Sequence, residues 1–170
     1  SAASPQGAGR RTFRRGEPIL VDIGCCIDGY VIDQTRTLSI GEIPAPLADA
    51  YAAAEHILKE TEQLLKPGTS CEALYVNAVR LAEEAGLAEH FMGFGADQVK
   101  FLGHGIGLEV DELPVLAQGF RYPLQEGMVI AIEPKFTFSQ AGMVGIENCY
   151  AITKDGCEKL TISREGIIMI

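Results

Sequence analysis

Positive charge is scarce in this sequence. Its 170 residues include 14 Lys and Arg against 23 Asp and Glu, which gives a formal net charge of −9 and a pI of about 4.8. Nucleic acids and anionic membranes are bound by clustered Lys and Arg, so the composition argues against both classes of partner. The one basic cluster contains a single aromatic residue, Phe13, and is interpreted as a solvated loop; its members are Arg10, Arg11, Arg14 and Arg15.

Long apolar runs are also missing. No stretch approaches the ~20 residues that a membrane-spanning helix needs, and the opening SAASPQGAGRR lacks the apolar core of a signal peptide. We therefore expect a cytoplasmic protein. Because the sequence does not begin with Met and its first twenty residues are loop-like, we also expect a piece of a longer protein.

Paired cysteines and phosphate-binding motifs are absent as well. The five cysteines form an odd number without C-x-x-C spacing, which argues against a disulfide framework and a structural zinc site. We interpret them as small buried hydrophobic residues, with Cys26 on the same strand face as Asp22. The glycines of MGFGADQVKFLGHGIG do not lead from a strand into a helix and lack a Gly-Lys-Ser/Thr sequence, so phosphate binding is not predicted.

The patterns that are present predict a single α+β domain over residues 1–170. A strand pair is expected around Val21 to Ile40, followed by an amphipathic helix that starts near Pro46 and stops at KPG. A second helix is expected from the capping-box spacing of Thr69 and Glu72 to Gly86. After a glycine-rich stretch, β-like runs return, and these are Met128 to Phe136, Met143 to Thr153, Glu158 to Thr161 and Ile167 to Ile170.

Two aspartates lie within the first strand pair, in VDIGCCIDGYVIDQTRT. Asp28-Gly29 is typical of a two-residue type I′ hairpin turn. In that register Asp22 lies opposite Thr35, and Asp22 and Asp33 are diagonal neighbours on one sheet face, roughly 7 Å or less apart. Carboxylates this close repel one another unless a proton or a cation lies between them. The simpler alternative is that Asp22 caps a turn and Asp33 pairs with Arg36.

Three further candidate ligands occur in strand-like or glycine-rich contexts: His104 in GHGIG, Glu133 in VIAIEP and Glu147 in GIENCY. Oxygen-rich coordination with one imidazole suits Mn or Co, with Zn and Fe also suitable. The four carboxylates carry a charge of −4, which two divalent ions would neutralise. The sequence therefore predicts a centre with two divalent metal ions, able to activate a shared water and polarise a carbonyl oxygen.

The order and flanks of these five residues resemble the pita-bread metallopeptidases, which include prolidase, aminopeptidase P and methionine aminopeptidase. The resemblance runs from about Gly16 to Ile170, through DIGCCIDGYVID, DQTRT, GHGIGLEVDE, IEP and GIEN. TRT after the second aspartate, in place of a DTS-like sequence, puts the chain nearer prolidase and aminopeptidase P. The resemblance implies the pita-bread fold, which is a curved antiparallel sheet with helices outside. It also implies that the chain is the C-terminal part of the catalytic domain.

The resemblance also implies roles for the five residues. Asp22 would chelate one metal ion, Asp33 and Glu147 would bridge the two, and His104 and Glu133 would complete the second. Glu133 would also be the catalytic group that moves a proton from the attacking water to the leaving amine. The implied activity is that of a di-metal exopeptidase acting on an N-terminal peptide bond, plausibly before proline. Its substrate would be a peptide, and whether the protein forms a homodimer stays open.

Several positions depart from the family pattern, and three of them bear on the charge of the site. Asp111, in the substrate-binding position, stands where the peptidases usually carry a second histidine, Gly145 stands in place of a common Arg, and Lys135 stands in place of Gly. The ammonium of Lys135 could replace charge lost at Gly145. Two alternatives therefore stay open: a non-catalytic binding protein with the pita-bread fold, and a metal-independent hydrolase of the creatinase type.

Overall fold

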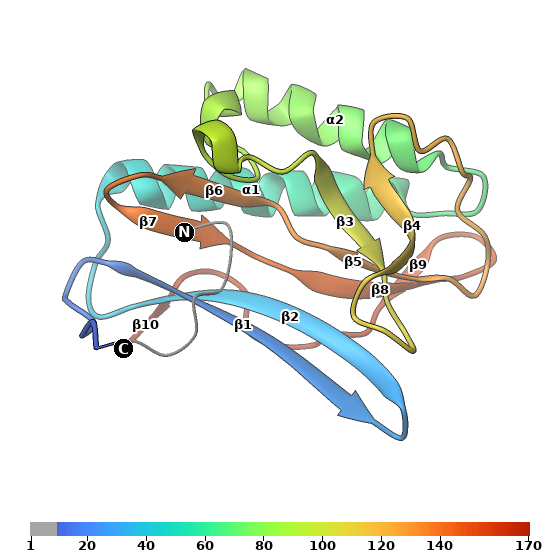
Figure 1. Ribbon diagram of the computed structural model, residues 1–170, viewed down its shortest axis with the longest axis horizontal. Coiled ribbons are helices and arrows are strands. Elements are labelled where there is room, and N and C mark those ends of the chain that lie inside the picture. Colours follow the sequence, from blue (N-terminus) through green and yellow to red (C-terminus); the bar gives the residue numbers. More distant parts are fainter. Residues whose placement is uncertain (1–9) are drawn as a thin grey trace.

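The computed structural model describes residues 10–170. Two helices lie on one side of a group of short strands, and a long β-hairpin lies on the other side (Figure 1). The helices are α1 (Ala45–Leu64) and α2 (Cys71–Glu84), followed by the 3₁₀ turns η1 (Ala88–His90) and η2 (Gly95–Asp97). The strands are β1 (Pro18–Ile27), β2 (Tyr30–Ser39), β3 (Phe101–Gly105), β4 (Glu112–Ala117), β5 (Val129–Ile132), β6 (Lys135–Phe138), β7 (Gly142–Gly145), β8 (Asn148–Ile152), β9 (Cys157–Lys159) and β10 (Ile168–Met169). The expected α+β class is confirmed.

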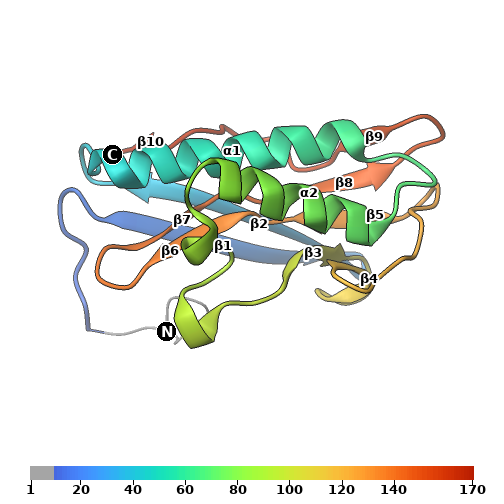
Figure 2. The same cartoon turned by 90° about the horizontal axis from the view of Figure 1, so that it is seen from above.

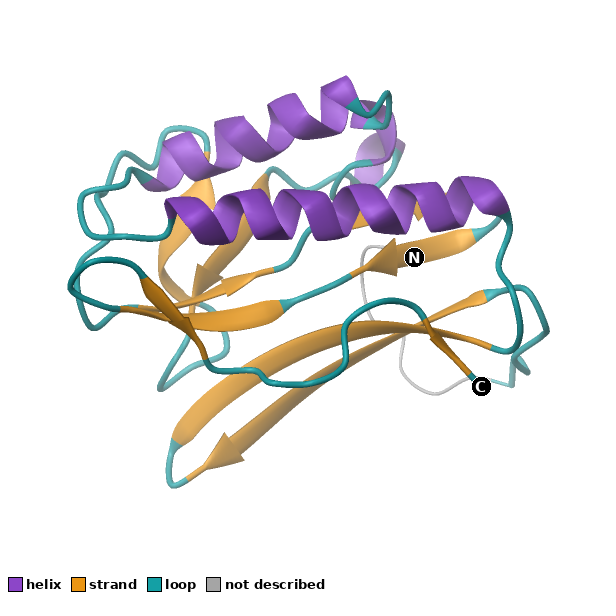
Figure 3. Ribbon diagram, turned by 180° about the vertical axis from the view of Figure 1, so that it is seen from behind, coloured by secondary structure: helices purple, strands orange, loops and turns teal. Residues whose placement is uncertain are grey.

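The hairpin β1–β2 has the predicted register. Ile27 pairs with Tyr30, Gly24 with Asp33, and Asp22 with Thr35. Asp28 and Gly29 both have positive φ, 53° and 88°, as a two-residue primed turn requires. β10 adds to the other edge of β2 in parallel, which makes a three-stranded sheet that curves beneath the rest of the molecule (Figure 3).

The remaining strands form a five-stranded sheet of order β4-β3-β5-β8-β9 and the separate pair β6–β7. Seen from above, α1 and α2 cover these strands (Figure 2). The predicted stripe of α1 is buried, and it forms one core with the inner face of α2 and with strand residues such as Leu102, Ile130 and Phe136. None of the helices in residues 10–170 is long and apolar enough to cross a membrane.

Both predicted glutamates interrupt strands. The run expected from Met128 to Phe136 divides after Ile132 into β5 and β6, and Glu133 lies at the break. The run expected from Met143 to Thr153 divides after Gly145 into β7 and β8, and Glu147 lies at that break. The backbone N–H groups stay bonded, since Glu133 donates to Leu102 O at 3.0 Å and Glu147 donates to Thr35 O at 3.1 Å. Each glutamate is therefore fixed where one sheet passes to another.

Two local predictions were wrong. The glycine-rich stretch from Phe91 to Pro123 contains the strands β3 and β4, and β3 pairs both with β4 and with the more distant β5. The capping box does not form, because Ser70 is the N-cap of α2, the Thr69 hydroxyl donates to Leu64 O, and Glu72 instead accepts bonds from the Gly119 N–H and from Arg121.

The interpretation of the cysteines as buried residues holds only in part. Cys71 and Cys149 are buried, Cys157 is partly buried, and Cys25 and Cys26 are exposed. The two exposed cysteines lie at the far end of β1, where the hairpin extends beyond the core and both faces of the strand are open to solvent.

Substituting Gly103 by Ala tests the close approach of β3 and β5. A Cβ at this position would lie 2.0 Å from Ala131 O, which is backbone and cannot move without breaking the sheet. We expect Gly103→Ala to lower the free energy of unfolding by roughly 3 kcal/mol, measured by denaturant titration. Gly156→Ala is the control, since nothing lies within 4 Å of its Cβ position, and an equal effect of both substitutions would contradict this packing argument.

Candidate metal centre

The five residues predicted as metal ligands converge in the structure. Asp22 comes from β1, Asp33 from β2, His104 from β3, Glu133 from the break after β5, and Glu147 from the break before β8. Their chemical roles as ligands stay predictions, but the requirement that they point to a common centre is met by the distances described below.

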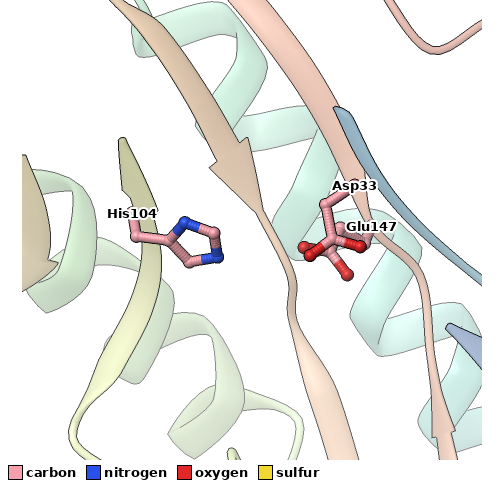
Figure 4. A group of neighbouring side chains, drawn as sticks. All are labelled: Asp33, His104 and Glu147. Carbon is pink, nitrogen blue, oxygen red and sulfur yellow. The ribbon is translucent and has the colours of Figure 1, made fainter. Parts of the chain in front are cut away.

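Three of the five form the tightest group. One ligand atom each from Asp33, His104 and Glu147 lies within 4.8 Å of the others. Figure 4 shows the imidazole of His104 pointing toward the two carboxylates. Among the residues that the structure describes, Asp33 Oδ1 and Glu147 Oε1 are buried without a hydrogen-bond partner. Buried oxygens of this kind require a partner, and a cation between them and the imidazole would provide it.

The orientation of His104 supports this arrangement. Its Nδ1 lies 2.9 Å from Gly105 O, and a carbonyl only accepts, so Nδ1 carries the hydrogen. Nε2 then presents its lone pair to Glu133 Oε1 at 3.5 Å and to Asp111 Oδ1 at 3.4 Å. Three electron-rich atoms facing one another are favourable only when a cation or a proton lies between them.

β2 fixes the buried carboxylate of Glu147. The hydroxyl of Thr35 donates to Glu147 Oε2 at 2.6 Å. Two residues further along the same strand face, Thr37 Oγ1 donates to Gly145 O and accepts from Gly145 N–H. Neither threonine was expected to be a site residue, although the period-two series Asp33, Thr35, Thr37 places polar groups on one buried strand face.

Arg36 is not the partner of Asp33. Its guanidinium, only 6% exposed, donates to Glu147 O, Asn148 Oδ1 and Thr35 O from the opposite face of β2. The alternative in which Asp33 forms a simple ion pair with Arg36 is therefore wrong. Arg36 instead holds the Glu147-Asn148 backbone against β2.

The remaining carboxylates gather around Lys135. Its Nζ lies 2.7 Å from Glu133 Oε2, 3.2 Å from Asp22 Oδ2 and 3.6 Å from Glu147 Oε2. Burial alone would lower the pKa of Lys135, but the charges of Glu133, Glu147 and Asp22 outweigh it and raise the pKa above its ordinary value. The side of the centre that Asp22 and Glu133 share thus already contains a positive charge.

Burial perturbs the two innermost carboxyl groups. It raises the pKa of Asp33 to about 7, and the negative charges of Glu147 and Asp22 add to this effect. Burial also raises the pKa of Glu147 to about 7, with Lys135 opposing the rise and Glu133 adding to it. In the absence of a metal ion, full ionisation of this pair is unfavourable at neutral pH.

Asp111 lies at the rim of the centre. It belongs to the loop between β3 and β4, and its side chain is 81% exposed although one oxygen is close to His104. The structure thus brings the predicted substrate-binding residue to the open side of the predicted ligands. Asp33, His104 and Glu147 fit a divalent ion, since they combine two unpartnered buried oxygens with an imidazole nitrogen.

The pH dependence of stability provides a test of the two raised pKa values. A carboxyl group whose pKa is higher in the folded state stabilises the fold below the unfolded pKa of about 4, and this contribution is lost as the pH rises through about 7. We expect the protein in EDTA to lose unfolding free energy from these groups as the pH rises from about 4 to about 7, measured by urea denaturation.

Glu147→Gln is the matched variant for this measurement, because it removes one of the two titrating groups with little change in volume. Its stability should change less over the same pH range than that of the unsubstituted protein. An identical pH profile for both proteins would contradict the assignment.

Comparison with known proteins gives consistent matches. The model of metallopeptidase family M24 matches residues 1–154. The Xaa-Pro dipeptidase of Lactobacillus delbrueckii subsp. lactis is 34% identical over 162 residues, 95% of this chain and 42% of that protein. The probable dipeptidase PepE of Mycobacterium tuberculosis is 36% identical over 87 residues, 51% of this chain and 23% of that protein.

Solved structures agree with the sequence relatives. The X-Pro aminopeptidase of Thermotoga maritima superposes with a TM-score of 0.90 at 29% identity over 99% of this chain and 46% of that chain. The prolidase of Pyrococcus horikoshii gives a TM-score of 0.88 at 33% identity over 98% of this chain and 46% of that chain. The chain spans less than half the length of each of these four relatives. It has the pita-bread fold expected from the sequence and belongs to metallopeptidase family M24.

Proposed function

We propose that this chain carries the metal-binding part of an exopeptidase that hydrolyses the peptide bond after an N-terminal residue, with Xaa-Pro dipeptides as the first substrates to test. The observation that carries the proposal is the convergence of Asp33, His104 and Glu147, two of them with unpartnered buried oxygens, beside the carboxylate of Glu133. The relatives named Xaa-Pro dipeptidase, X-Pro aminopeptidase and prolidase support this choice of substrate.

We further propose that Mn or Co is the activating ion, with Zn or Fe also suited to the oxygen-rich set and its one imidazole. The expected pair of ions rests on the count of four carboxylates. Lys135 already supplies one positive charge among these carboxylates. Hydrolysis still requires at least one divalent ion, because the ion activates the water.

A bound divalent ion would lower the pKa of a water molecule and polarise the scissile carbonyl. Glu133 is the residue proposed to move the proton. Oε1 of Glu133 lies 3.5 Å from His104 Nε2, at the centre, and Oε2 accepts a hydrogen bond from Lys135 Nζ at 2.7 Å. A carboxylate in this position can accept a proton from the attacking water and pass it to the leaving amine.

Asp111 is proposed to contact the substrate. An exposed carboxylate at the rim cannot donate a hydrogen bond to a developing oxyanion while it is ionised, but it can accept one from the free α-ammonium group of a peptide. This role fits an enzyme that acts at the N-terminus. The whole of residues 1–170 is assigned to the catalytic domain, in the cytoplasm, without a nucleic-acid or membrane partner and with a homodimer open to test.

A non-catalytic binding protein is the second candidate. The observation that favours it is the position of Lys135, whose ammonium occupies part of the carboxylate cluster. A binding protein would retain peptide affinity without turnover at any metal concentration, whereas the proposed peptidase depends on added Mn²⁺ or Co²⁺. The metal-independent creatinase-type alternative has no matching observation, because all five predicted ligands converge.

Glu133→Gln tests the proposed catalytic role. We expect kcat on Xaa-Pro dipeptides to fall about a thousandfold, because the amide cannot accept the proton of the attacking water. The measurement is release of free proline by the full-length protein in saturating Mn²⁺ or Co²⁺, against a panel that includes dipeptides without proline.

Glu158→Gln is the matched control, because Glu158 is exposed on β9, away from the centre. Its turnover should equal that of the unsubstituted protein. Metal content is measured in parallel to distinguish a lost base from a lost ion. Turnover that survives in Glu133→Gln would show that the catalytic assignment is wrong.

A further inference from the structure

The ammonium group of Lys135 occupies the position where a cation would bind three of the carboxylates. Its nearest oxygens are Glu133 Oε2 at 2.7 Å, Asp22 Oδ2 at 3.2 Å and Glu147 Oε2 at 3.6 Å. The lysine side chain is 12% exposed, so it is enclosed with these carboxylates instead of extending into solvent. The contacts are the charge-assisted ones expected of a permanent ion pair.

The path of Lys135 into the centre depends on Gly145. The two residues face each other across the β6–β7 pair. A Cβ on residue 145 would lie 2.6 Å from Lys135 Cγ and 3.0 Å from Lys135 Cα. The φ of Gly145 is not in the left-handed region, so glycine is needed here for space and not for backbone conformation. The absence of a side chain at 145 makes room for the aliphatic part of the lysine and also for the facing backbone, since Pro134 O would lie 2.8 Å from the same Cβ.

A metal ion and this ammonium would compete for the same oxygens. Transition ions bind carboxylate oxygens at about 2.0 to 2.2 Å, so an ion held by Asp22, Glu133 and Glu147 Oε2 would lie close to the present position of Nζ. Two cations cannot share that position, because their repulsion in a partly buried site is strong.

The opposite side of the cluster is arranged differently. Asp33 Oδ1, Glu147 Oε1 and His104 Nε2 lie away from the ammonium group, and the two oxygens have no hydrogen-bond partner among residues 10–170. Lys135 thus satisfies one half of the centre and leaves the other half in need of a cation.

We infer that Lys135 is an internal cation that takes the place of one of two divalent ions, so that the protein binds a single ion through Asp33, His104 and Glu147. The inference depends on the proposed metal centre and is independent of the proposed hydrolysis. It makes the two halves of the centre unequal: one has a permanent charge attached to the chain, and the other has an exchangeable charge.

The number of bound Mn²⁺ ions tests the inference directly. The metal-free protein is titrated with Mn²⁺ by calorimetry, and ions retained after gel filtration are counted by mass spectrometry. We expect one ion per chain for the unsubstituted protein and two for Lys135→Ala, which vacates the position of the ammonium group.

Lys159→Ala is the matched control. Lys159 also contacts carboxylates, Glu165 at 2.8 Å and Glu62 at 4.0 Å, but it lies on β9 outside the cluster. This variant should bind one ion. In EDTA, Lys135→Ala should melt at a lower temperature than Lys159→Ala and should gain more from added Mn²⁺, because the stabilisation by bound ions grows with the number that bind.

Two ions in the unsubstituted protein, or one ion in a folded Lys135→Ala, would overturn the inference. The first of these measurements does not depend on whether the variant folds. Absence of Mn²⁺ from all three proteins would contradict the metal centre itself, whereas a loss of turnover with one ion bound would affect only the proposed hydrolysis. The two proposals can therefore fail separately.

Discussion

Four carboxylates meet where the β1–β2 hairpin approaches the breaks in the other strands, and their mutual repulsion is the constraint on which the surrounding structure depends. Lys135 offsets the charge of Asp22 and Glu133, and Thr35 donates to Glu147. The carboxylate oxygens that these contacts leave without a partner belong to Asp33 and Glu147, the two groups whose pKa values are raised to about 7. The unsatisfied charge and the imidazole of His104 thus define the candidate cation site.

Backbone geometry explains how such groups can be held close together in a fold that must also bury a core. Glu133 and Glu147 are placed between strands, where the chain passes from one sheet to another, yet their N–H groups still bond to Leu102 and Thr35. These two N–H groups therefore stay bonded while the side chains turn toward the hairpin. Arg36 secures the same segment from the other face of β2 through three neutral oxygens.

Local signals in the sequence were sufficient for the hairpin and the first helix. The Asp28-Gly29 turn fixes the register, and the register fixes Asp22 and Asp33 as neighbours. The strands β3 and β4 could not be predicted in the same way, because Gly103 is present for close contact with Ala131 on β5 and Gly105 for close contact with Leu113 on β4, and such contacts leave no periodic pattern. The exposure of Cys25 and Cys26 likewise depends on how far the hairpin extends beyond the core.

The residues of the candidate site were predictable from their order and spacing through the family resemblance. The difference between the side that contains Lys135 and the side that contains His104 was not predictable. Lys135 was expected to replace charge lost at position 145, and the structure adds that its ammonium contacts three of the predicted ligands. Thr35 and Thr37 escaped notice because a threonine in a strand is ordinary unless the opposite face is known to be buried. Both kinds of information depend on the pairing of β6 with β7 and on the packing of β2 against Gly145 and Glu147, which no local stretch specifies.

The facing pair Lys135 and Gly145 has a consequence for how this protein could have diverged. A Cβ at 145 would lie 2.6 Å from Lys135 Cγ, 2.8 Å from Pro134 O and 3.0 Å from Lys135 Cα, so the facing backbone excludes a side chain there as well as the lysine does. A side chain at 145 therefore requires β6 and β7 to move apart, whatever residue stands at 135. Any ancestral step that exchanged a larger residue for Gly145 would thus have changed the spacing of this strand pair, and not only the charge beside the carboxylates.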